Sequence, residues 1–161
     1  MAKKLDEKTR KKLINYLESR FGIDSSFLAD YLFVISGKSV SIIYKTRETQ
    51  KIIENQIRQN FTISFGIEIF SNYKDYKPSS LGFSSFAKKQ IKQNFVELTR
   101  NQTNTYFSGK EIATKDIKNK NLLSSGFVAC VYGNHIIGTA RFDKEKQIII
   151  PNISFVNEKT K

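Results

Sequence analysis

The run Gly126-Phe-Val-Ala-Cys-Val-Tyr-Gly-Asn-His-Ile-Ile-Gly-Thr-Ala140 decides how the second half of this chain folds. Apolar and β-branched residues lead to Tyr132, and Gly133-Asn134 then offers a turn before a second apolar segment begins at His135. This pattern predicts a β-hairpin. Cys130, the only cysteine, falls inside the first strand, where core packing is its expected role. His135, the only histidine, borders the turn and is expected to be solvated rather than a general base.

Short strands are also predicted on both sides of this hairpin. They span Phe95–Thr99, Glu111–Thr114 and Gln147–Ile150, with a charged turn at Asp143–Lys146. Closely spaced short strands with tight turns favour a small β-barrel over a parallel sheet.

The first half has a different texture, in which helical and strand patterns alternate. Asp6-Glu7 is expected to cap a helix that ends at Gly22, and Asp24 a second, shorter helix. Further along, strands 32–36 and 39–45 are predicted to form a hairpin that turns at Gly37-Lys38. A helix is expected after Thr46, with Ile52, Ile53 and Ile57 buried, and a strand is expected over 61–69. A turn over 74–80 then leads to one or two helical turns around Phe83, Phe86 and Ala87. The expected fold class is α+β, with an N-terminal α/β domain over 1–92 and a C-terminal barrel over 93–161.

Composition limits the possible functions. With 161 residues and 39% hydrophobic content, the chain can bury a real core. No apolar run reaches the length of a membrane span, and no secretory signal follows the basic start, so no membrane partner is expected. A single cysteine excludes an intramolecular disulfide framework and favours a cytoplasmic setting. The sequence shows no nucleotide-binding loop, no metal-ligand spacing and no paired acid–base residues, so a non-catalytic protein without cofactor or metal is expected.

The charge is the most informative number, because 27 basic residues stand against 15 acidic ones and give a net charge of +12. Such an excess attracts polyanions, since each phosphate neutralised by Lys or Arg releases counterions. Lysine that merely maintains solubility is the alternative interpretation. The excess is spread over the chain, with +8 over residues 1–92 and +4 over 93–161, which indicates a charged folded body rather than a basic tail.

The second half resembles the PUA domain, named for pseudouridine synthases and archaeosine transglycosylases. The features that carry the resemblance follow one another over residues 93–155: a strand Phe95-Val-Glu-Leu98, a helix-like stretch Asn101–Phe107, the glycine of Ser108-Gly-Lys-Glu-Ile112, the hairpin ending in Gly138-Thr-Ala140, and a closing strand Ile148-Ile-Ile-Pro-Asn152.

The first half is similar to the domain that precedes PUA in two families. The matching pieces are Arg20-Phe-Gly-Ile-Asp24, Asp30-Tyr-Leu-Phe33, Gly37-Lys-Ser-Val40, and Phe65-Gly-Ile67 with Lys77-Pro-Ser79. One family is the Nip-seven ribosome-biogenesis family with its archaeal relatives. The other is the RNA-binding tail of Sun/Nop RNA cytosine-5 methyltransferases. Because the chain carries no methyltransferase domain, the archaeal Nip-seven-like type is the expected one.

The resemblance implies an RNA groove formed by the helix, the strand after its glycine and the last strand. Carried over, this groove contains Arg100, Asn101, Ser108, Gly109, Lys110 and Asn152. Further candidates for phosphate contact are Lys115, Lys118, Lys120, Arg141 and Lys146. Each also has an ordinary interpretation: Gly109 as a helix C-cap, and the cations as solvated loop or hairpin charge. Tyr106 and Phe107 are candidates for base stacking, although core packing is expected for at least one.

Two functions follow from these observations. The first is an RNA-binding accessory factor in rRNA processing, ribosome biogenesis or RNA modification. It would bind structured rRNA or tRNA, and no DNA partner is expected. The alternative is a protein–protein adaptor in ribosome assembly, with ribosome-assembly or exosome-associated proteins as partners. A continuous positive groove across Arg100, Lys110 and Lys146 would favour the first, and exposed apolar residues on the first half would favour the second. An unrecognised enzyme is the least favoured interpretation and would need a pocket of convergent polar groups.

Overall fold

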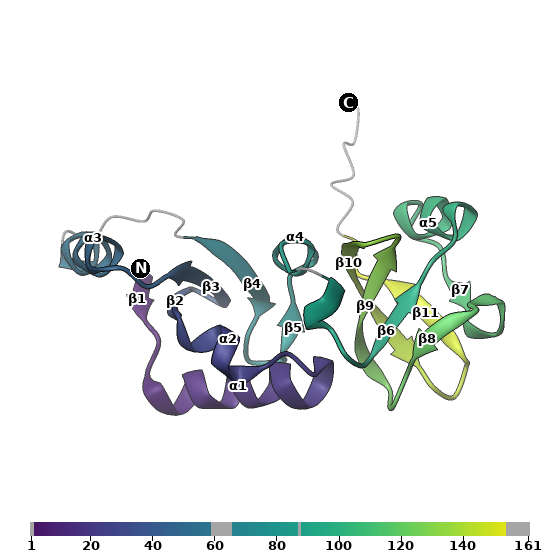
Figure 1. Cartoon of the computed structure of the whole chain (residues 1–161), viewed down its shortest axis with the longest axis horizontal. Helices are drawn as coiled ribbons and strands as arrows, with labels where there is room; N and C mark the ends of the chain where they lie inside the picture. Colours follow the sequence, from purple (N-terminus) through teal and green to yellow (C-terminus); the bar gives the residue numbers. More distant parts are fainter. Residues whose placement is uncertain (1, 59–65, 87, 154–161) are drawn as a thin grey trace.

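The computed structural model describes residues 2–58, 66–86 and 88–153 and shows an α+β chain with two β-sheets (Figure 1). The helices are α1 (Glu7–Phe21), α2 (Ser25–Ala29), α3 (Arg47–Arg58), α4 (Ser80–Ser84) and α5 (Arg100–Phe107), with short 3₁₀ turns at Lys88–Gln90 and Thr114–Asp116. The strands are β1 (Ala2–Lys4), β2 (Tyr31–Ser36), β3 (Ser39–Tyr44), β4 (Ile67–Asn72), β5 (Lys77–Pro78), β6 (Phe95–Glu97), β7 (Ile112–Ala113), β8 (Asn119–Asn121), β9 (Gly126–Tyr132), β10 (His135–Asp143) and β11 (Ile148–Pro151).

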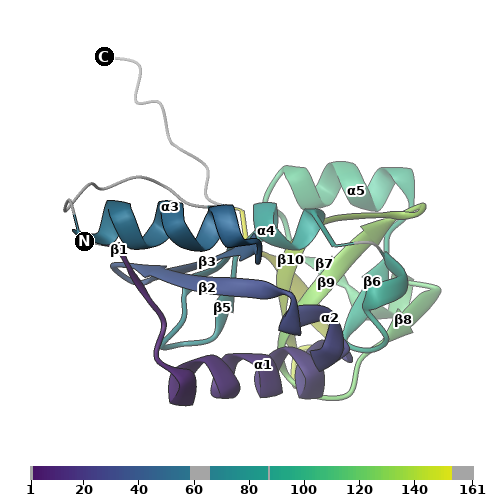
Figure 2. The same cartoon turned by 60° about the vertical axis from the view of Figure 1, so that its left-hand side comes forward.

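The first sheet is a meander of order β1-β2-β3-β4-β5 in which every neighbouring pair is antiparallel. Helices α1 and α3 lie on its opposite faces (Figure 2). Strand β2 supplies both faces by simple alternation, because Phe33 and Ile35 pack into the α1 core while Val34 packs against Ile53 of α3. The predicted mixture of helices and strands in the first half is therefore confirmed.

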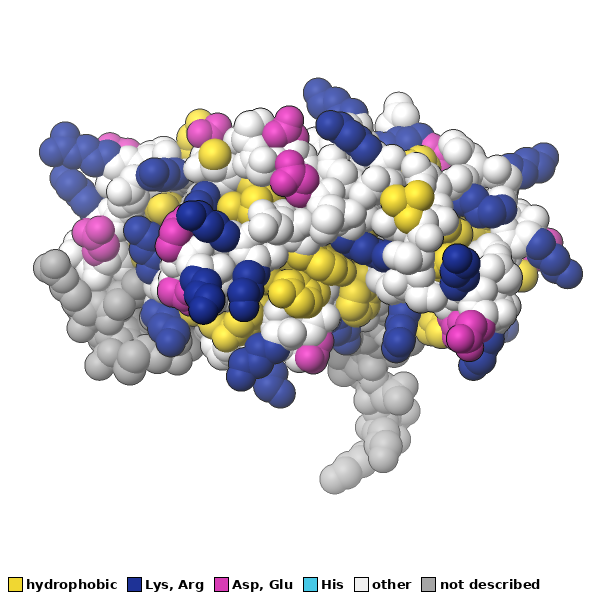
Figure 3. All heavy atoms as spheres, turned by 90° about the horizontal axis from the view of Figure 1, so that it is seen from below, with side chains coloured by type: hydrophobic (Ala, Val, Ile, Leu, Met, Phe, Trp, Pro, Cys, Tyr) yellow, Lys and Arg dark blue, Asp and Glu magenta, His cyan; other side chains and the backbone are white. Residues whose placement is uncertain are grey.

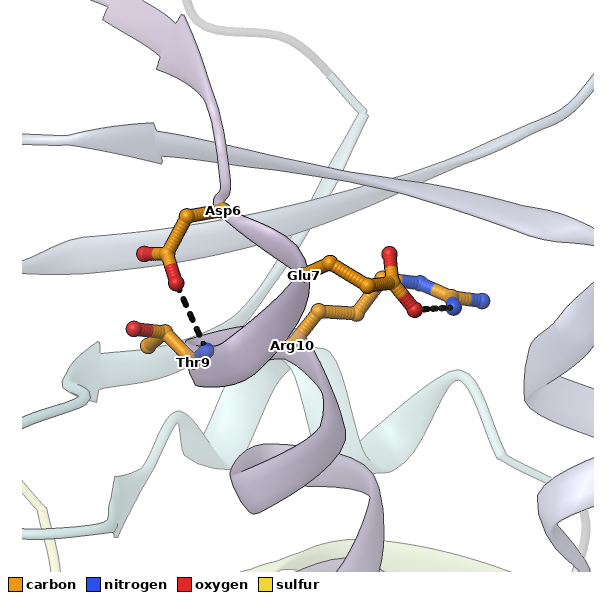
Figure 4. Close-up of polar contacts among 4 residues, drawn as sticks. All are labelled: Asp6, Glu7, Thr9 and Arg10. Carbon is orange, nitrogen blue, oxygen red and sulfur yellow. Dashed lines mark hydrogen bonds and ion pairs between the residues drawn. The ribbon is translucent and has the colours of Figure 1, made fainter.

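Helix α1 forms as its sequence predicts. The Asp6 carboxylate accepts a hydrogen bond from the Thr9 backbone N–H at 2.8 Å, which is the expected N-cap (Figure 4). Its apolar face is buried through Leu13, Leu17 and Phe21, and the helix ends at Gly22.

Two other predictions for the first half differ from the structure. Helix α3 presents only a narrow stripe to the sheet, so Ile53 is buried whereas Ile52 is 51% exposed; the side chain of Ile57 lies outside the described residues. Most of the predicted strand 61–69 also falls outside them, and β4 runs on to Asn72. Its expected alternation is interrupted: Ile69 and Phe70 are both buried, and Ile67 is 44% exposed. The cause is an irregularity in the β3–β4 register between Val40 and Ser41.

The second sheet has the order β7-β11-β10-β9-β6-β8, with β6 and β9 parallel and all other pairs antiparallel. Its two edge strands, β7 and β8, are joined by residues 114–118 alone, and so short a link requires the sheet to curl. The concave side encloses a core that includes Val96, Tyr106, Phe142 and Ile149. The five predicted strands of this half are confirmed, and β8 is an additional strand within a segment interpreted as a loop.

Strand β9 belongs to two cores at once. Val128 and Cys130 point into the curled sheet, whereas Ala129 and Val131 pack into the core of the first half. A strand buried on both faces requires an unbroken apolar run, which is what residues 127–131 provide. The first sheet ends at Pro78 and the second begins at Phe95, on either side of the predicted boundary at 92/93.

Hydrogen bonds reinforce the contact between the two halves around β9, which we call the seam. The Arg20 guanidinium donates from Nε to the Phe127 carbonyl at 2.7 Å and from Nη1 to the Ser124 hydroxyl at 2.6 Å. The buried amide of Asn94 donates to the Arg20 carbonyl at 2.6 Å and accepts from the Leu123 N–H at 3.1 Å. These bonds hold the C-terminal end of α1 against the start of β9.

A second set of bonds holds α4 against β10. The Ser80 hydroxyl lies 3.0 Å from the Thr139 hydroxyl, and it donates to the Asn152 carbonyl at 3.0 Å. The Thr139 N–H donates to Ser80 Oγ at 3.1 Å. As a result, α4 of the first half and α5 of the second half lie near the same side of the molecule (Figure 2).

Within the described part of the chain, no helix combines the length and apolar character that a membrane crossing requires.

Candidate functional site

Helix α5 carries the predicted site, and both of its ends have well-defined caps. At the N-terminus, Thr99 and Gln102 form a capping box. At the C-terminus, Gly109 has φ 70°, its N–H donates to the Tyr106 carbonyl at 2.9 Å, and the Lys110 N–H donates to the Thr105 carbonyl at 3.2 Å. This pattern is a Schellman motif. The C-cap interpretation of Gly109 is therefore confirmed, and the cap places Lys110 directly beyond the helix.

The polar residues predicted on α5 lie on its outer surface. All four are exposed: Arg100, Asn101, Ser108 and Lys110. The Ser108 hydroxyl donates to the Asn104 carbonyl at 2.7 Å. Among the described residues, neither Arg100 nor Lys110 forms an ion pair, so both charges are available to an external anion.

The two aromatic residues at the end of α5 have opposite environments. Tyr106 is 1% exposed, and its hydroxyl donates to the Thr139 carbonyl at 3.0 Å. Burial raises the pKa of this phenol. Phe107 is 52% exposed. The prediction that at least one of the pair packs in the core is confirmed by Tyr106.

Gly138 explains how Tyr106 fits. Its φ is 151°, and a Cβ at this position would lie 2.3 Å from the Tyr106 hydroxyl oxygen. Only glycine permits this backbone conformation together with the close approach of the phenol. The small-residue segment Gly138-Thr139-Ala140 is therefore the place where α5 attaches to the sheet.

Phe107 lines a cleft of about 450 Å³ between α4 and α5. The walls are largely apolar and include Leu81, Ile137 and Ile153. Leu81 is 80% exposed, although it is a large aliphatic side chain. Polar side chains line the rest of the cleft, among them Glu68, Lys77 and several serines. A cleft of this size, in which apolar walls meet polar groups, is typical of a binding site. Sequence reasoning missed Leu81, because a helix as short as Ser80–Ser84 has no readable periodicity.

Two predicted contact residues also have partners within the fold. The Asn152 amide donates to the Pro78 carbonyl and to the Thr139 hydroxyl, both at 3.2 Å. The Lys120 ammonium donates to the carbonyls of Thr114 at 2.8 Å and Ile117 at 2.7 Å. These groups hold the seam and the β7–β8 link, so both residues have a structural role. Lys120 is nevertheless exposed, and Asn152 lines the α4–α5 cleft.

The remaining predicted cations are exposed but dispersed. Lys115 lies in the 3₁₀ turn after β7, Lys118 precedes β8, Arg141 lies on β10 and Lys146 lies in the β10–β11 turn. This turn is shaped by Asp143, whose carboxylate accepts from the N–H groups of Glu145 at 3.0 Å and Lys146 at 3.1 Å. Neither Lys146 nor Arg100 or Lys110 lines the α4–α5 cleft, so this cleft is not a continuous positive groove across those three residues.

Groups with catalytic or metal-binding chemistry are sparse in the described residues. No set of three or more His, Cys, Asp or Glu side chains among them is placed to hold a metal ion. Cys130 is fully buried, and burial raises the pKa of its thiol, which disfavours the nucleophilic thiolate.

Comparison of the sequence with protein-family models and with curated proteins finds no match.

Proposed function

We propose that this chain is an RNA-binding accessory factor of rRNA processing, ribosome biogenesis or RNA modification, and that it binds RNA through the outer surface of α5. In this proposal Phe107 stacks on an unpaired base at the mouth of the α4–α5 cleft, while Lys110 and Arg100 contact phosphates. The observation that carries the proposal is the half-exposed Phe107 ring, which lines the α4–α5 cleft. Three residues further on lies Lys110, which forms no ion pair within the described part of the chain.

The chemistry of the surface fits single-stranded or looped RNA. Stacking of a base on an aromatic side chain contributes about 1–3 kcal/mol and accepts any base, because every base has a π face. Gly109 has no side chain beside Lys110, which lets a sugar–phosphate chain approach the backbone closely. The resemblance of this half to a PUA domain supports the same partner.

The charge distribution supports a polyanionic partner. The net charge is +12, and Figure 3 shows Lys and Arg side chains spread over the α1 side of the molecule rather than gathered in one block. Among the described residues, only Arg10 with Glu7 and Lys88 with Glu97 form ion pairs. Most of the described cations are therefore not neutralised by an ion pair, and a long-range attraction to RNA follows.

Crosslinking to total cellular RNA tests the proposal. Crosslinked peptides should concentrate in residues 100–120 and 141–152, and Lys110→Glu should reduce them. Phe107→Ala should weaken RNA affinity by about 5- to 150-fold, the factor that corresponds to the stacking energy of one base. The matched controls are Lys38→Glu, in the exposed β2–β3 turn, and Tyr132→Ala, an exposed aromatic residue at the end of β9. Crosslinking that both α5 variants leave unchanged would reject the proposed surface.

A protein adaptor is the second candidate, and the exposed Leu81 favours it. Tyr44, Ile52 and Ile67 are further exposed apolar residues of the first half. In that case the α4–α5 cleft takes an apolar side chain of a partner protein. Leu81→Ser would then abolish partner capture while RNA crosslinking stayed at the wild-type level.

A further inference from the structure

A second cleft, of about 370 Å³, lies at the other end of the molecule, between the start of α1, strand β1 and the segment that follows β3. Its lining includes Lys4, Glu7, Arg10, Tyr31, Lys45 and Gln50, and we call it the N-terminal basic cleft. In Figure 1, β1 lies at one end of the long axis and α5 at the other. The two clefts are therefore separate sites.

The charge of this cleft is unbalanced. Lys4 comes from β1, Arg10 from α1 and Lys45 from the segment after β3, so three cations from three separate elements meet one acid, Glu7. Bringing like charges together costs free energy in the folded state. Lys4 and Lys45 are exposed, so neither side chain is needed to pack the core. An external anion would remove this cost.

Arg10 is held in position for such an anion. Its Nη1 lies 3.3 Å from the Glu7 carboxylate, and its guanidinium carbon lies 5.4 Å from the centre of the Phe33 ring. Glu7 engages one end of the guanidinium, and the opposite end points away from it (Figure 4). A planar, pre-oriented guanidinium with further N–H groups suits the oxygens of a phosphate. Among the described residues, Lys4 and Lys45 form no ion pair and can supply the remaining charge.

We infer that the N-terminal basic cleft binds a phosphate group of the RNA backbone through Lys4, Arg10 and Lys45. This inference rests on the proposed function, which supplies RNA as the partner. It extends the RNA footprint from the α5 surface to the opposite end of the molecule. A free phosphate ion offers the same oxygens, and the test separates the two sources.

The test compares two double variants that remove equal charge. Lys4→Gln/Lys45→Gln empties the cleft of its unpaired cations, and Lys11→Gln/Lys12→Gln removes two exposed lysines of α1 that do not line it. Affinity for unfractionated tRNA is measured by fluorescence anisotropy over a series of KCl concentrations. In the first variant, the slope of log K against log salt should fall in magnitude by about 0.7–0.9 for each phosphate that the protein no longer neutralises. The control slope should stay near that of the wild type.

The outcomes separate this inference from the proposed function. Equal slopes for the two double variants, with Lys110→Glu still weakening tRNA binding, would overturn the basic cleft and leave the α5 surface standing. A reduced slope in the cleft variant, with no effect of Lys110→Glu, would support the cleft and reject the α5 surface.

Titration with inorganic phosphate gives a third readout, by amide shifts of Tyr31 and Gln50. Saturable binding of phosphate, together with a salt-dependence slope for tRNA in Lys4→Gln/Lys45→Gln equal to that of the wild type, would overturn RNA as the source of the anion. The single variant Lys45→Gln and the thermal midpoint of each protein control for misfolding.

Discussion

At the seam between the two halves, Arg20 donates hydrogen bonds to Phe127 and Ser124, and the hydroxyls of Ser80 and Thr139 lie in contact. On the α5 side, Arg100 and Lys110 are exposed and form no ion pair among the described residues. Both places carry an arginine, but the surroundings of Arg20 and Arg100 differ. A polar group whose partners lie within the fold contributes to stability, whereas a cation facing solvent is free to bind a ligand.

This difference predicts opposite responses to the same substitution. Changes on the seam side should lower the free energy of unfolding and leave RNA affinity unchanged as long as the protein is folded. Changes to exposed residues on the α5 side should lower RNA affinity and leave the free energy of unfolding unchanged. Three matched pairs of variants test the contrast, each with one residue on a structural contact and one on the open surface.

The largest difference is expected between Arg20→Met and Arg100→Met. Loss of Arg20 removes charge-assisted hydrogen bonds and leaves the Phe127 carbonyl without this donor, which should cost about 2–4 kcal/mol in the free energy of unfolding. Arg100→Met should change it by no more than about 0.5 kcal/mol, as expected for an exposed residue. Urea unfolding measures both. Equal destabilisation by the two variants would remove the basis of the comparison.

A smaller difference is expected between the neighbours Tyr106 and Phe107. Tyr106→Phe removes the hydrogen bond to the Thr139 carbonyl, which also accepts from the Asn152 N–H, so the cost should be about 1 kcal/mol. Phe107→Leu should leave stability within about 0.5 kcal/mol but reduce tRNA affinity. Chemical denaturation and anisotropy give the two values. Normal tRNA binding by Phe107→Leu would argue against base stacking.

The smallest difference is expected between Lys120→Met and Lys118→Met. The Lys120 ammonium holds two carbonyls of the β7–β8 link, so its removal should cost about 0.5–1 kcal/mol. Lys118 is exposed, and its replacement should have no measurable effect on stability. Hydrogen exchange of the Ile117 amide, which donates to the Thr114 carbonyl, reports the local effect. Unchanged protection in Lys120→Met would show that this ammonium does not stabilise the link.

Sequence patterns predicted helix ends and hairpin turns where a capping residue or a turn residue marks them. The Asp6 cap and the Gly22 stop bound α1, and Gly37-Lys38 and Gly133-Asn134 turn two hairpins, since these residues act on the backbone next to them. The irregularity between β3 and β4 had no such signal. It depends on how two strands pair, and it buries the consecutive residues Ile69 and Phe70.

The candidate site was predictable only in part. The helix of residues 100–107 and its cap at Gly109 follow from local chemistry, and so does the placement of Lys110 beyond it. The roles of Asn152 and Lys120 did not follow, because their partners include groups that no local pattern points to. Leu81 carried no signal at all, since its exposure results from the position of α4 beside the second sheet.

The sequence by itself determined the charge excess, the helix caps, the hairpin turns and the apolar run of β9, all of which depend on neighbouring residues or on simple sums. The tertiary structure alone decided that β9 is buried on both faces, that Phe107 and Leu81 line one cleft, and that Lys4, Arg10 and Lys45 line another. Those arrangements depend on packing between residues far apart in the chain, and no local pattern encodes which distant partner a side chain meets.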